Sequence, residues 1–441
     1  MLQWENLSGN RLCEPASLER ASRAVETPNI ESDLSQNQSK SADAKAPLAP
    51  AVLQVLPALG TAGGVERGTV DVAKALVAAG WRAVVASQGG PLVRELERAG
   101  ATHVTLPLAS KSPLVMLKNI DRLRAVIAEQ AIDIVHARSR APAWSAEAAA
   151  KRAGVHFLTT FHGNYSIGTP LKRLYNAVMT RGERVIAISE FIADHMVRTY
   201  RVAPEKIRVI QRGVDISQFD PARVSQERII KLANQWRLPE ERHILLLPGR
   251  LSPWKGHEVL IEALARLRRK DLFVILLGVG AGSSKLREEL EGAIVRARVE
   301  DSVRLIDECR DMPAAYMLAD VVIAPSTRPE AFGRIAIEAQ AMGRPIITTD
   351  HGGGRETVIT GSTGVLVAPS DAGALATAIA QIIALDGAAR DQLGRQAIAH
   401  VRAHFTNDVM CAATLAVYDE LLAPAGKGAQ QAADQLRPGL V

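Results

Sequence analysis

Short, almost wholly apolar runs alternate along this chain with longer segments in which apolar residues recur at every third or fourth position. The short runs predict buried strands and the longer segments predict amphipathic helices. The predicted strands are 52–57, 82–87, 103–106, 133–136, 156–160, 184–188, 244–248, 272–277, 303–306, 319–324 and 345–349. The predicted helices include 68–79, 114–130, 144–153, 171–180, 257–267, 372–384 and 390–405. This alternation predicts an α/β fold with doubly wound parallel sheets, whose ligand crevice lies at the carboxyl ends of the strands.

At 441 residues the chain is too long for one ordinary hydrophobic core and long enough for two domains. Residues 1–46 are polar with little periodicity, so we expect a disordered extension there. The polar, proline-punctuated stretch 223–241 reads as a linker between a first domain, 47–222, and a second domain, 242–405. The remaining predicted parts are a helix at 406–423 and a disordered tail at 424–441.

Composition excludes several classes of protein. The chain is 47% hydrophobic and 23% charged, which is ordinary for a soluble α/β protein. Its three cysteines, Cys13, Cys309 and Cys411, are widely spaced, which argues for a reducing compartment and against a disulfide framework or a structural zinc site. No apolar run reaches the length of a membrane span, and the polar, acidic start does not resemble a signal peptide. We therefore expect a cytoplasmic protein.

The net charge of +6 is unevenly placed. Residues 51–215 hold 22 lysines and arginines against 13 acidic residues, so all the excess positive charge lies in the first domain. Because the aromatic-interleaved basic pattern of single-strand binders is missing, we favour an anionic membrane surface over nucleic acid as the partner. Segments 111–118 and 168–175 mix apolar residues with lysine or arginine, as interfacial helices do. The same mix equally suits ordinary helices that pack their apolar side on a sheet.

The stretch 325–345 carries the densest chemistry. It follows a predicted buried strand and passes through Gly333 and Arg334 into a helix. Glu330 precedes the helix N-terminus and Glu338 lies inside the helix, so the two carboxylates can face one cleft from different heights. The N–H groups and positive dipole end of the helix suit a phosphate, whereas carboxylates beside a phosphate suit neutral sugar hydroxyls. A ligand that contains both a diphosphate and a sugar fits both the helix N-terminus and the carboxylates. In the alternative interpretation, Glu330 caps the helix and Glu338 is a solvated residue on its surface.

Two further turns lie at predicted strand ends. The strand that begins at residue 244 delivers Arg250 and Lys255, and two fixed cations there suit a diphosphate leaving group on which negative charge grows. If Arg250 and Lys255 are ordinary exposed charges of a loop, they indicate no ligand site. Gly63 and Gly64 follow the first strand, where they either let the backbone approach a phosphate or substrate closely or simply make a tight turn. The G-x-G-x-x-G spacing is absent, which disfavours a dinucleotide oxidoreductase.

The two glutamates resemble the E-x7-E signature of retaining glycosyltransferases of family 4, which have the GT-B fold of two Rossmann-like domains facing across a cleft. Residues 249–256 resemble that family's G-R-x-x-x-x-K-G turn. Residues 211–215 resemble its P-N-G-V-D turn, with Gln211 and Arg212 in place of proline and asparagine. The resemblance covers roughly residues 50–422, and three linked motifs in the correct order argue against a chance match.

The resemblance implies how the donor is held. Glu330 and the N–H groups of Phe332 and Gly333, beside Arg334, would position the donor sugar, and Glu338 would hold the ribose hydroxyls. Arg250 and Lys255 would neutralise the diphosphate. No D-x-D motif occurs in the chain, so we expect a metal-independent enzyme with no cofactor beyond the nucleotide-diphosphate sugar.

The resemblance also assigns roles to the first domain. His162 would assist at the transferred sugar, and His136 would lie at the acceptor-side turn, although both histidines could be ordinary polar residues at strand ends. The turn of Gly63 and Gly64 would face the cleft. The helix at 406–423 would cross back to pack on the first domain.

The resemblance implies a retaining hexosyltransferase that uses a nucleotide-diphosphate sugar. By analogy and charge, the expected acceptor is a lipid-linked glycan or lipopolysaccharide core at the cytoplasmic face of the plasma membrane. Two alternatives remain open. A nucleotide-sugar 2-epimerase of GT-B fold would need no acceptor, and a non-catalytic binding or scaffold subunit would need no intact phosphate and sugar contacts.

Overall fold

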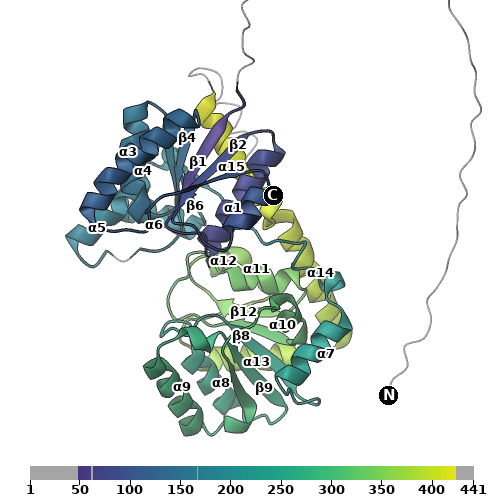
Figure 1. Cartoon of the computed structure of the whole chain (residues 1–441). Coiled ribbons are helices and arrows are strands. Elements are labelled where there is room, and N and C mark those ends of the chain that lie inside the picture. Colours follow the sequence, from purple (N-terminus) through teal and green to yellow (C-terminus); the bar gives the residue numbers. More distant parts are fainter. Residues whose placement is uncertain (1–47, 61–62, 166, 424–441) are drawn as a thin grey trace, which may run out of the picture. The chain divides into compact units, whose positions relative to one another are not determined.

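The structure, a computed structural model, describes residues 48–60, 63–165 and 167–423, so the predicted extension at 1–46 and the tail at 424–441 lie outside the described residues. In these ranges the chain forms a seven-stranded parallel sheet with the order β3-β2-β1-β4-β5-β6-β7 (Figure 1). Its strands are β1 (Ala51–Val55), β2 (Arg82–Ser87), β3 (Thr102–Thr105), β4 (Ile134–Ala137), β5 (His156–Phe161), β6 (Arg184–Ala187) and β7 (Ile207–Val209). The strand order reverses between β1 and β4, and a reversal of this kind opens a crevice at the carboxyl ends of the strands.

A second parallel sheet follows, with six strands in the order β10-β9-β8-β11-β12-β13. Its strands are β8 (His243–Pro248), β9 (Leu272–Leu277), β10 (Val303–Ile306), β11 (Val321–Ala324), β12 (Ile346–Thr349) and β13 (Val365–Val367). The order reverses again, between β8 and β11. Two doubly wound parallel sheets confirm the predicted fold class.

Helices connect the strands of both sheets. Around the first sheet lie α1 (Gly64–Ala78), α2 (Val93–Arg98), α3 (Pro113–Glu129), α4 (Arg140–Ala153), α5 (Pro170–Ala177) and α6 (Glu190–His195). The second half adds α7 (Gln226–Gln235), α8 (His257–Leu267), α9 (Ser284–Ala297), α10 (Met312–Leu318), α11 (Arg334–Ala341), α12 (Gly354–Thr357), α13 (Ala372–Ile383), α14 (Gly387–His404) and α15 (Asn407–Leu422).

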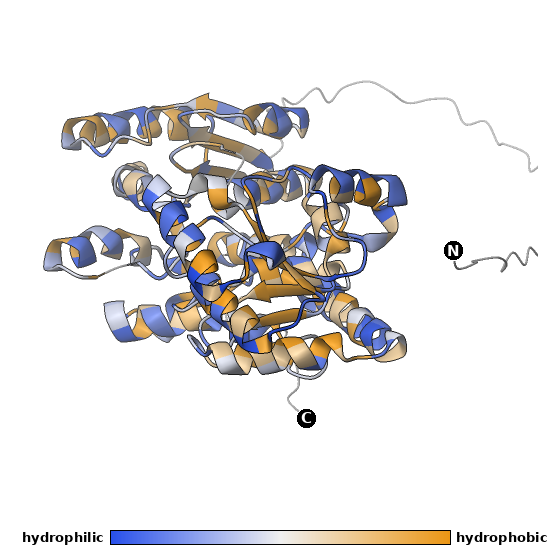
Figure 2. Ribbon diagram, turned by 90° about the horizontal axis from the view of Figure 1, so that it is seen from below, coloured by the Kyte–Doolittle hydropathy of each residue, from blue (hydrophilic) through white to orange (hydrophobic). Residues whose placement is uncertain are grey.

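The central strand β1 shows why both faces of the first sheet are covered. Leu53 packs in the same cluster as Leu123 of α3, whereas its neighbour Val52 packs with Leu76 of α1 and Tyr418 of α15. Successive side chains of a strand point to opposite faces, so each face needs its own layer of helices. Figure 2 shows the result, with strands that are almost uniformly hydrophobic and helices that carry both hydrophobic and hydrophilic residues.

The predicted strands and helices agree with the observed ones to within a few residues, and α8 and β9 have the predicted bounds. The stretch 223–241, expected as a linker, contains α7, which was not predicted. Ser225 caps this helix, Leu232 and Trp236 are buried, and Arg228 pairs with Asp311 at 2.6 Å. Pro221 and Pro239, on either side of α7, concealed a short amphipathic helix that packs on α10.

Among the residues that the structure describes, no single helix is long and apolar enough to cross a membrane. Helices α13 and α14 reach the required length and composition only as a pair, and the chain bends by 110° between them.

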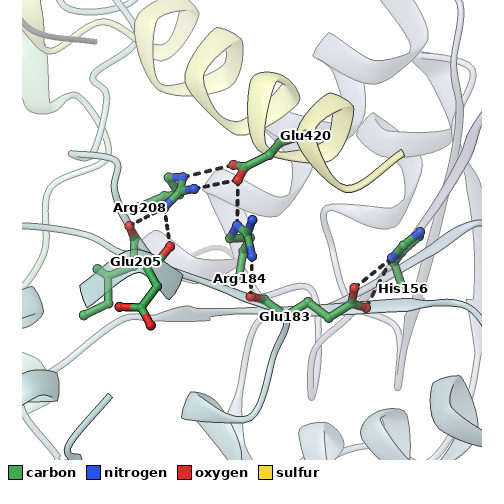
Figure 3. A network of polar contacts seen from close by, with 7 residues as sticks. His156, Glu183, Arg184, Glu205, Arg208 and Glu420 are labelled. Atoms are coloured by element: carbon green, nitrogen blue, oxygen red, sulfur yellow. Dashed lines mark hydrogen bonds and ion pairs between the residues drawn. The ribbon is translucent and has the colours of Figure 1, made fainter. Parts of the chain in front are cut away.

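Helix α15 returns to the first sheet. The hydroxyl of Tyr418 and Nδ1 of His136 lie 2.7 Å apart in the interior. At the rim of the sheet the carboxylate of Glu420 accepts hydrogen bonds from Nε of Arg184 at 2.7 Å and from Nε of Arg208 at 2.9 Å (Figure 3). The two arginines come from β6 and β7, so one carboxylate joins the last helix to two strands more than two hundred residues earlier.

Replacing Glu420 tests this join. Hydrogen bonds to charged groups that are partly exposed are worth about 1–2 kcal/mol, so Glu420→Gln should lower the free energy of unfolding by about that amount. Burial raises the pKa of Glu420, but hydrogen bonds from Arg208 and Arg184 outweigh it and hold the pKa below its ordinary value of 4.5. The stabilisation is therefore present above pH 4.5 and is lost as the pH falls through the folded-state pKa.

Urea denaturation at neutral and acidic pH measures this effect. Asp419→Asn is the matched control, because Asp419 is the exposed neighbour on the same helix and burial raises its pKa instead of lowering it. Equal unfolding free energies for wild type and Glu420→Gln at neutral pH would contradict the expected contribution.

Candidate active site

Side chains from the carboxyl ends of both sheets line a cavity of about 740 Å³. The first half of the chain contributes Gly64, His162 and Arg212, among others. The second half contributes the loop from Arg328 to Gly333, with Trp254 and Arg334. A smaller adjoining cavity of about 250 Å³ shares Gly64, Arg212 and Arg334 with the larger one. Most of the residues predicted from the sequence therefore converge on one region.

The loop that carries Glu330 is shaped by a glycine turn after β12. The N–H of Gly353 donates to the carbonyl of Glu330 at 2.9 Å. A Cβ atom on Gly353 would lie 2.4 Å from Cα of Phe332, and Gly352 has a φ of +62°. Only residues without a side chain allow this approach and this conformation. The turn thus fixes the backbone between Glu330 and the start of α11.

Glu330 and Lys255 form an ion pair in this loop, with 2.9 Å between Oε1 and Nζ. The hydroxyl of Ser326 donates to the same oxygen. The side chains of Lys255 and Glu330 are only 14% and 19% exposed, so water screens the pair weakly. Nζ of Lys255 also lies 4.8 Å from the centre of the Trp254 ring, a cation–π distance. The cation predicted to meet a phosphate is therefore held by a carboxylate before any ligand binds.

Arg250, the second predicted cation, is exposed at the end of β8. It forms no hydrogen bond or ion pair with any residue that the structure describes. Nothing in the described residues competes for its guanidinium, so it is free to meet an anion in solution.

Glu338 lies in α11, and its side chain is 12% exposed. Its carboxylate accepts from the hydroxyl of Tyr316 at 2.8 Å and from Nη2 of Arg334 at 2.7 Å. Glu338 lines the smaller cavity and Glu330 the larger, so the two carboxylates face adjoining cavities and not a single cavity. Arg334 lines both. Tyr316 was not predicted, because nothing in its local sequence distinguishes it from a core aromatic residue.

Phe332, Gly333 and Arg334 line the larger cavity where α11 begins. Gly333 precedes the helix with a φ of +91°, a conformation that favours glycine. The positive end of the helix dipole therefore faces the region that also holds Glu330.

Gly63 and Gly64 stand at the start of α1, four residues earlier than the predicted start of this helix. Gly63 lines the smaller cavity, and Gly64 lines both. A Cβ atom on Gly64 would lie 3.1 Å from Nη1 of Arg334. The predicted glycine turn thus reaches the site, close to an arginine of the second half.

His162 follows the end of β5 and lines the larger cavity. Its Nδ1 lies 2.7 Å from Nη2 of Arg212, and its Nε2 is buried with no partner among the described residues. Burial lowers the pKa of His162 well below its ordinary value, and the charges of Arg212 and Arg138 lower it further. The ring is therefore neutral at neutral pH.

The prediction that His136 lies at an acceptor-side turn is corrected by the structure. His136 belongs to β4 and is fully buried, with Nδ1 bonded to Tyr418 and Nε2 bonded to Thr160 at 2.7 Å. It lines neither cavity. Because α15 covers this face of the sheet, the ring connects the helix to the strand and does not line the site.

Contacts between the two halves of the chain surround the site. The hydroxyl of Ser189 donates to the carbonyl of Ala331 at 2.6 Å. The carboxylate of Glu356 accepts from the N–H groups of Glu190 and Phe191, each at 2.8 Å, and so caps the start of α6. These contacts were not predicted, since they join segments about 150 residues apart.

Burial also perturbs an acid at the rim of the smaller cavity. It raises the pKa of Asp71 to about 6, although the positive charges of Arg67 and Lys74 oppose this shift.

No cluster of three His, Cys, Asp or Glu side chains that could hold a metal ion occurs in the ranges that the structure describes.

Models of two glycosyltransferase families match the two halves of the chain. The family model of glycosyl transferases group 1 matches residues 229–400, and that of Glycosyltransferase Family 4 matches residues 62–218. The crystal structure of a glycosyltransferase from Rickettsia africae is 36% identical and superposes with a TM-score of 0.79, covering 86% of this chain and 100% of the other.

Two further relatives bear on ligands. HepE of Anabaena, solved in complex with UDP-glucose, is 26% identical with a TM-score of 0.72, over 83% of this chain and 99% of its own. The D-inositol 3-phosphate glycosyltransferase of Salinispora tropica is 33% identical over 56% of this chain and 52% of its own length. The chain thus spans about half the length of the curated relatives that it matches.

Proposed function

The chain belongs to the family 4 glycosyltransferases of the GT-B fold, and on that premise we propose that it transfers a hexose from a nucleotide-diphosphate sugar with retention and without a metal ion. One observation carries the proposal. The Glu330–Lys255 ion pair, the start of α11 at Gly333 and the unpartnered Nε2 of His162 all belong to the lining or immediate surroundings of one cavity.

Binding of the donor exchanges partners within this cavity. A diphosphate brings two or more negative charges, which attract Lys255 and the free Arg250. Lys255 then turns from Glu330 to the phosphate, and the carboxylate of Glu330 accepts hydrogen bonds from sugar hydroxyls. Tyr316 and Arg334 already orient the carboxylate of Glu338, which accepts hydrogen bonds from the ribose hydroxyls. The UDP-glucose complex of HepE supports a nucleotide sugar as the donor.

The leaving group and not a side chain handles the proton in this proposal. Arg250 and Lys255 stabilise the negative charge that develops as the bond from the anomeric carbon to the phosphate oxygen breaks. The acceptor hydroxyl attacks from the same face, and the departing phosphate oxygen takes its proton, so the configuration is retained. Glu330 stays a hydrogen-bond acceptor throughout, and the hydroxyl of Ser326 still orients its carboxylate after Lys255 has turned to the phosphate.

For the acceptor we propose a lipid-linked glycan or lipopolysaccharide core at the cytoplasmic face of the membrane. Leu114 and Leu117 of α3 are 72% and 60% exposed, and Leu171 and Leu174 of α5 are 78% and 55% exposed. Lysine and arginine accompany both pairs in the sequence. Exposed apolar residues flanked by cations suit an anionic lipid surface.

Helix α4 contacts both of the helices that carry these leucines. The hydroxyl of Ser145 donates to the carbonyl of Met116, and Nε1 of Trp144 donates to the carbonyl of Tyr175. Consecutive residues of α4 therefore contact both leucine-bearing helices. We name the four leucines of α3 and α5 the apolar rim.

Release of nucleoside diphosphate from a panel of nucleotide sugars, with and without a membrane extract, tests the proposed reaction. Release that depends on one donor and increases with the extract is expected. Absence of release from every donor by a folded protein would contradict the proposal and favour an epimerase or a binding subunit.

Replacing two leucines of the apolar rim tests the membrane contact. Each buried leucine contributes about 1.5–3 kcal/mol, so changing Leu171 and Leu174 to serine should weaken binding to phosphatidylglycerol-containing vesicles at least about tenfold. Vesicle co-sedimentation measures the effect, with Val295→Ser as control, because Val295 is a 59% exposed apolar residue on α9 of the second half. Equal affinity of wild type and the double variant would contradict the contact.

A further inference from the structure

Arg212 occupies the position of the asparagine in the P-N-G-V-D turn of the family 4 glycosyltransferases. It is buried, with 8% of the residue exposed. Its Nη1 donates to the carbonyl of Gly64, and its Nη2 lies 2.7 Å from Nδ1 of His162. Burial, with the charges of Arg138 and Arg334, lowers the pKa of Arg212 to about 9, so the guanidinium remains charged at neutral pH. A buried cation with both ends of its fork occupied has a fixed position.

The contact determines which nitrogen of His162 carries the proton. A guanidinium has N–H donors and no acceptor, so Nδ1 of His162 must accept the hydrogen bond and be unprotonated. A neutral imidazole protonated at one nitrogen only must then carry its hydrogen on Nε2. The charged and titratable groups that act on His162 are Arg212, Arg138 and His136, and none of them favours the imidazolium.

Nε2 of His162 is buried and has no partner among the described residues. A buried N–H without an acceptor is costly, and the cavity that His162 lines is where an oxygen from a ligand would satisfy it. We infer that Arg212 is a positioning residue, which holds His162 as the Nε2–H tautomer so that it donates a hydrogen bond to an oxygen of the transferred sugar.

This inference rests on the proposed function and deepens it. His162 selects donors that present an oxygen at this point, because a sugar without that oxygen leaves the N–H unpaired. The ring does not act as a base through Nε2, since that nitrogen already carries its hydrogen. Arg212 does not touch the sugar, and its effect passes through the ring.

Nuclear magnetic resonance of the full chain labelled with nitrogen-15 histidine tests the tautomer without any substrate. His162→Gln identifies the signals. In wild type at neutral pH we expect Nε2 to show the shift of a protonated nitrogen and Nδ1 that of an unprotonated one. In Arg212→Met we expect a mixture of tautomers, whereas Arg212→Lys, which keeps a charged donor, should retain part of the wild-type pattern.

A protonated Nδ1 in wild type, or an unchanged spectrum in Arg212→Met, would overturn the inference. The protonation state of Nδ1 is measured on wild type alone, so the inference can still be tested if Arg212→Met fails to fold. Arg94→Met is the matched control, since Arg94 is exposed on α2, and its histidine spectrum should equal that of wild type.

The release assay separates failure of this inference from failure of the proposed function. His162→Gln and Arg212→Met should each reduce kcat/KM by a similar factor, and the double variant should show little further loss, because both act through one hydrogen bond. Additive losses would overturn the inference even if transfer is confirmed. A wild type with the expected tautomer and no release from any donor would instead contradict the proposed function.

Discussion

Glu330→Gln is expected to reduce kcat/KM for nucleotide-sugar turnover by about 10²–10³-fold, the effect of removing one pre-oriented charged group from an active site. The amide keeps the size of the side chain and can still accept from Ser326. The variant lacks the negative carboxylate. In wild type this group holds Lys255 before the donor binds and accepts hydrogen bonds from sugar hydroxyls afterwards. Steady-state release of nucleoside diphosphate measures the loss.

Glu258→Gln is the matched control for this variant. Glu258 lies at the start of α8, close in sequence to Lys255, but it is exposed and we assign it no ligand contact. It should retain wild-type activity. Wild-type activity in Glu330→Gln would contradict a role of the carboxylate in turnover.

Arg250→Gln should also lower kcat by about 10²–10³-fold, because it removes one of the two cations that we assign to the leaving diphosphate. It should leave the free energy of unfolding unchanged, since Arg250 is exposed and has no partner among the described residues. Lys255→Gln should lower kcat by a similar factor but also destabilise the fold, because it leaves Glu330 buried without its counter-charge.

Thermal unfolding and turnover, measured side by side on these two variants, separate stability from chemistry. Arg395→Gln is the control, because Arg395 is exposed on α14 and lines neither cavity. A loss of stability in Arg250→Gln, or full activity in both variants, would contradict the assignment of the two cations.

The sequence was sufficient for the fold and for the residues of the Glu330 loop, because their signals are local. Apolar runs predict strands wherever they occur, and the glycines, cations and glutamates follow those strands at fixed spacings. Helix α7 was missed although its signal was present. Ile229, Leu232 and Trp236 recur at helical spacing after the capping Ser225, between two prolines.

His136 and His162 show what the sequence does not contain. Both stand near the end of a strand, but His136 lies within β4 on a face that α15 covers, whereas His162 lies just beyond β5 in the cavity. The difference depends on a helix that begins about 270 residues later, at Asn407. The pairing of Arg212 with His162 has the same origin, since loops far apart in sequence meet only in the folded chain.

Transfer of label from a radioactive donor sugar into the lipid fraction of a membrane extract tests the central claim most directly. The account predicts that label enters that fraction in proportion to the nucleoside diphosphate released, and that Glu330→Gln lowers both by about 10²–10³-fold. Nucleoside diphosphate released while the label remains as free sugar or in another nucleotide sugar would contradict transfer.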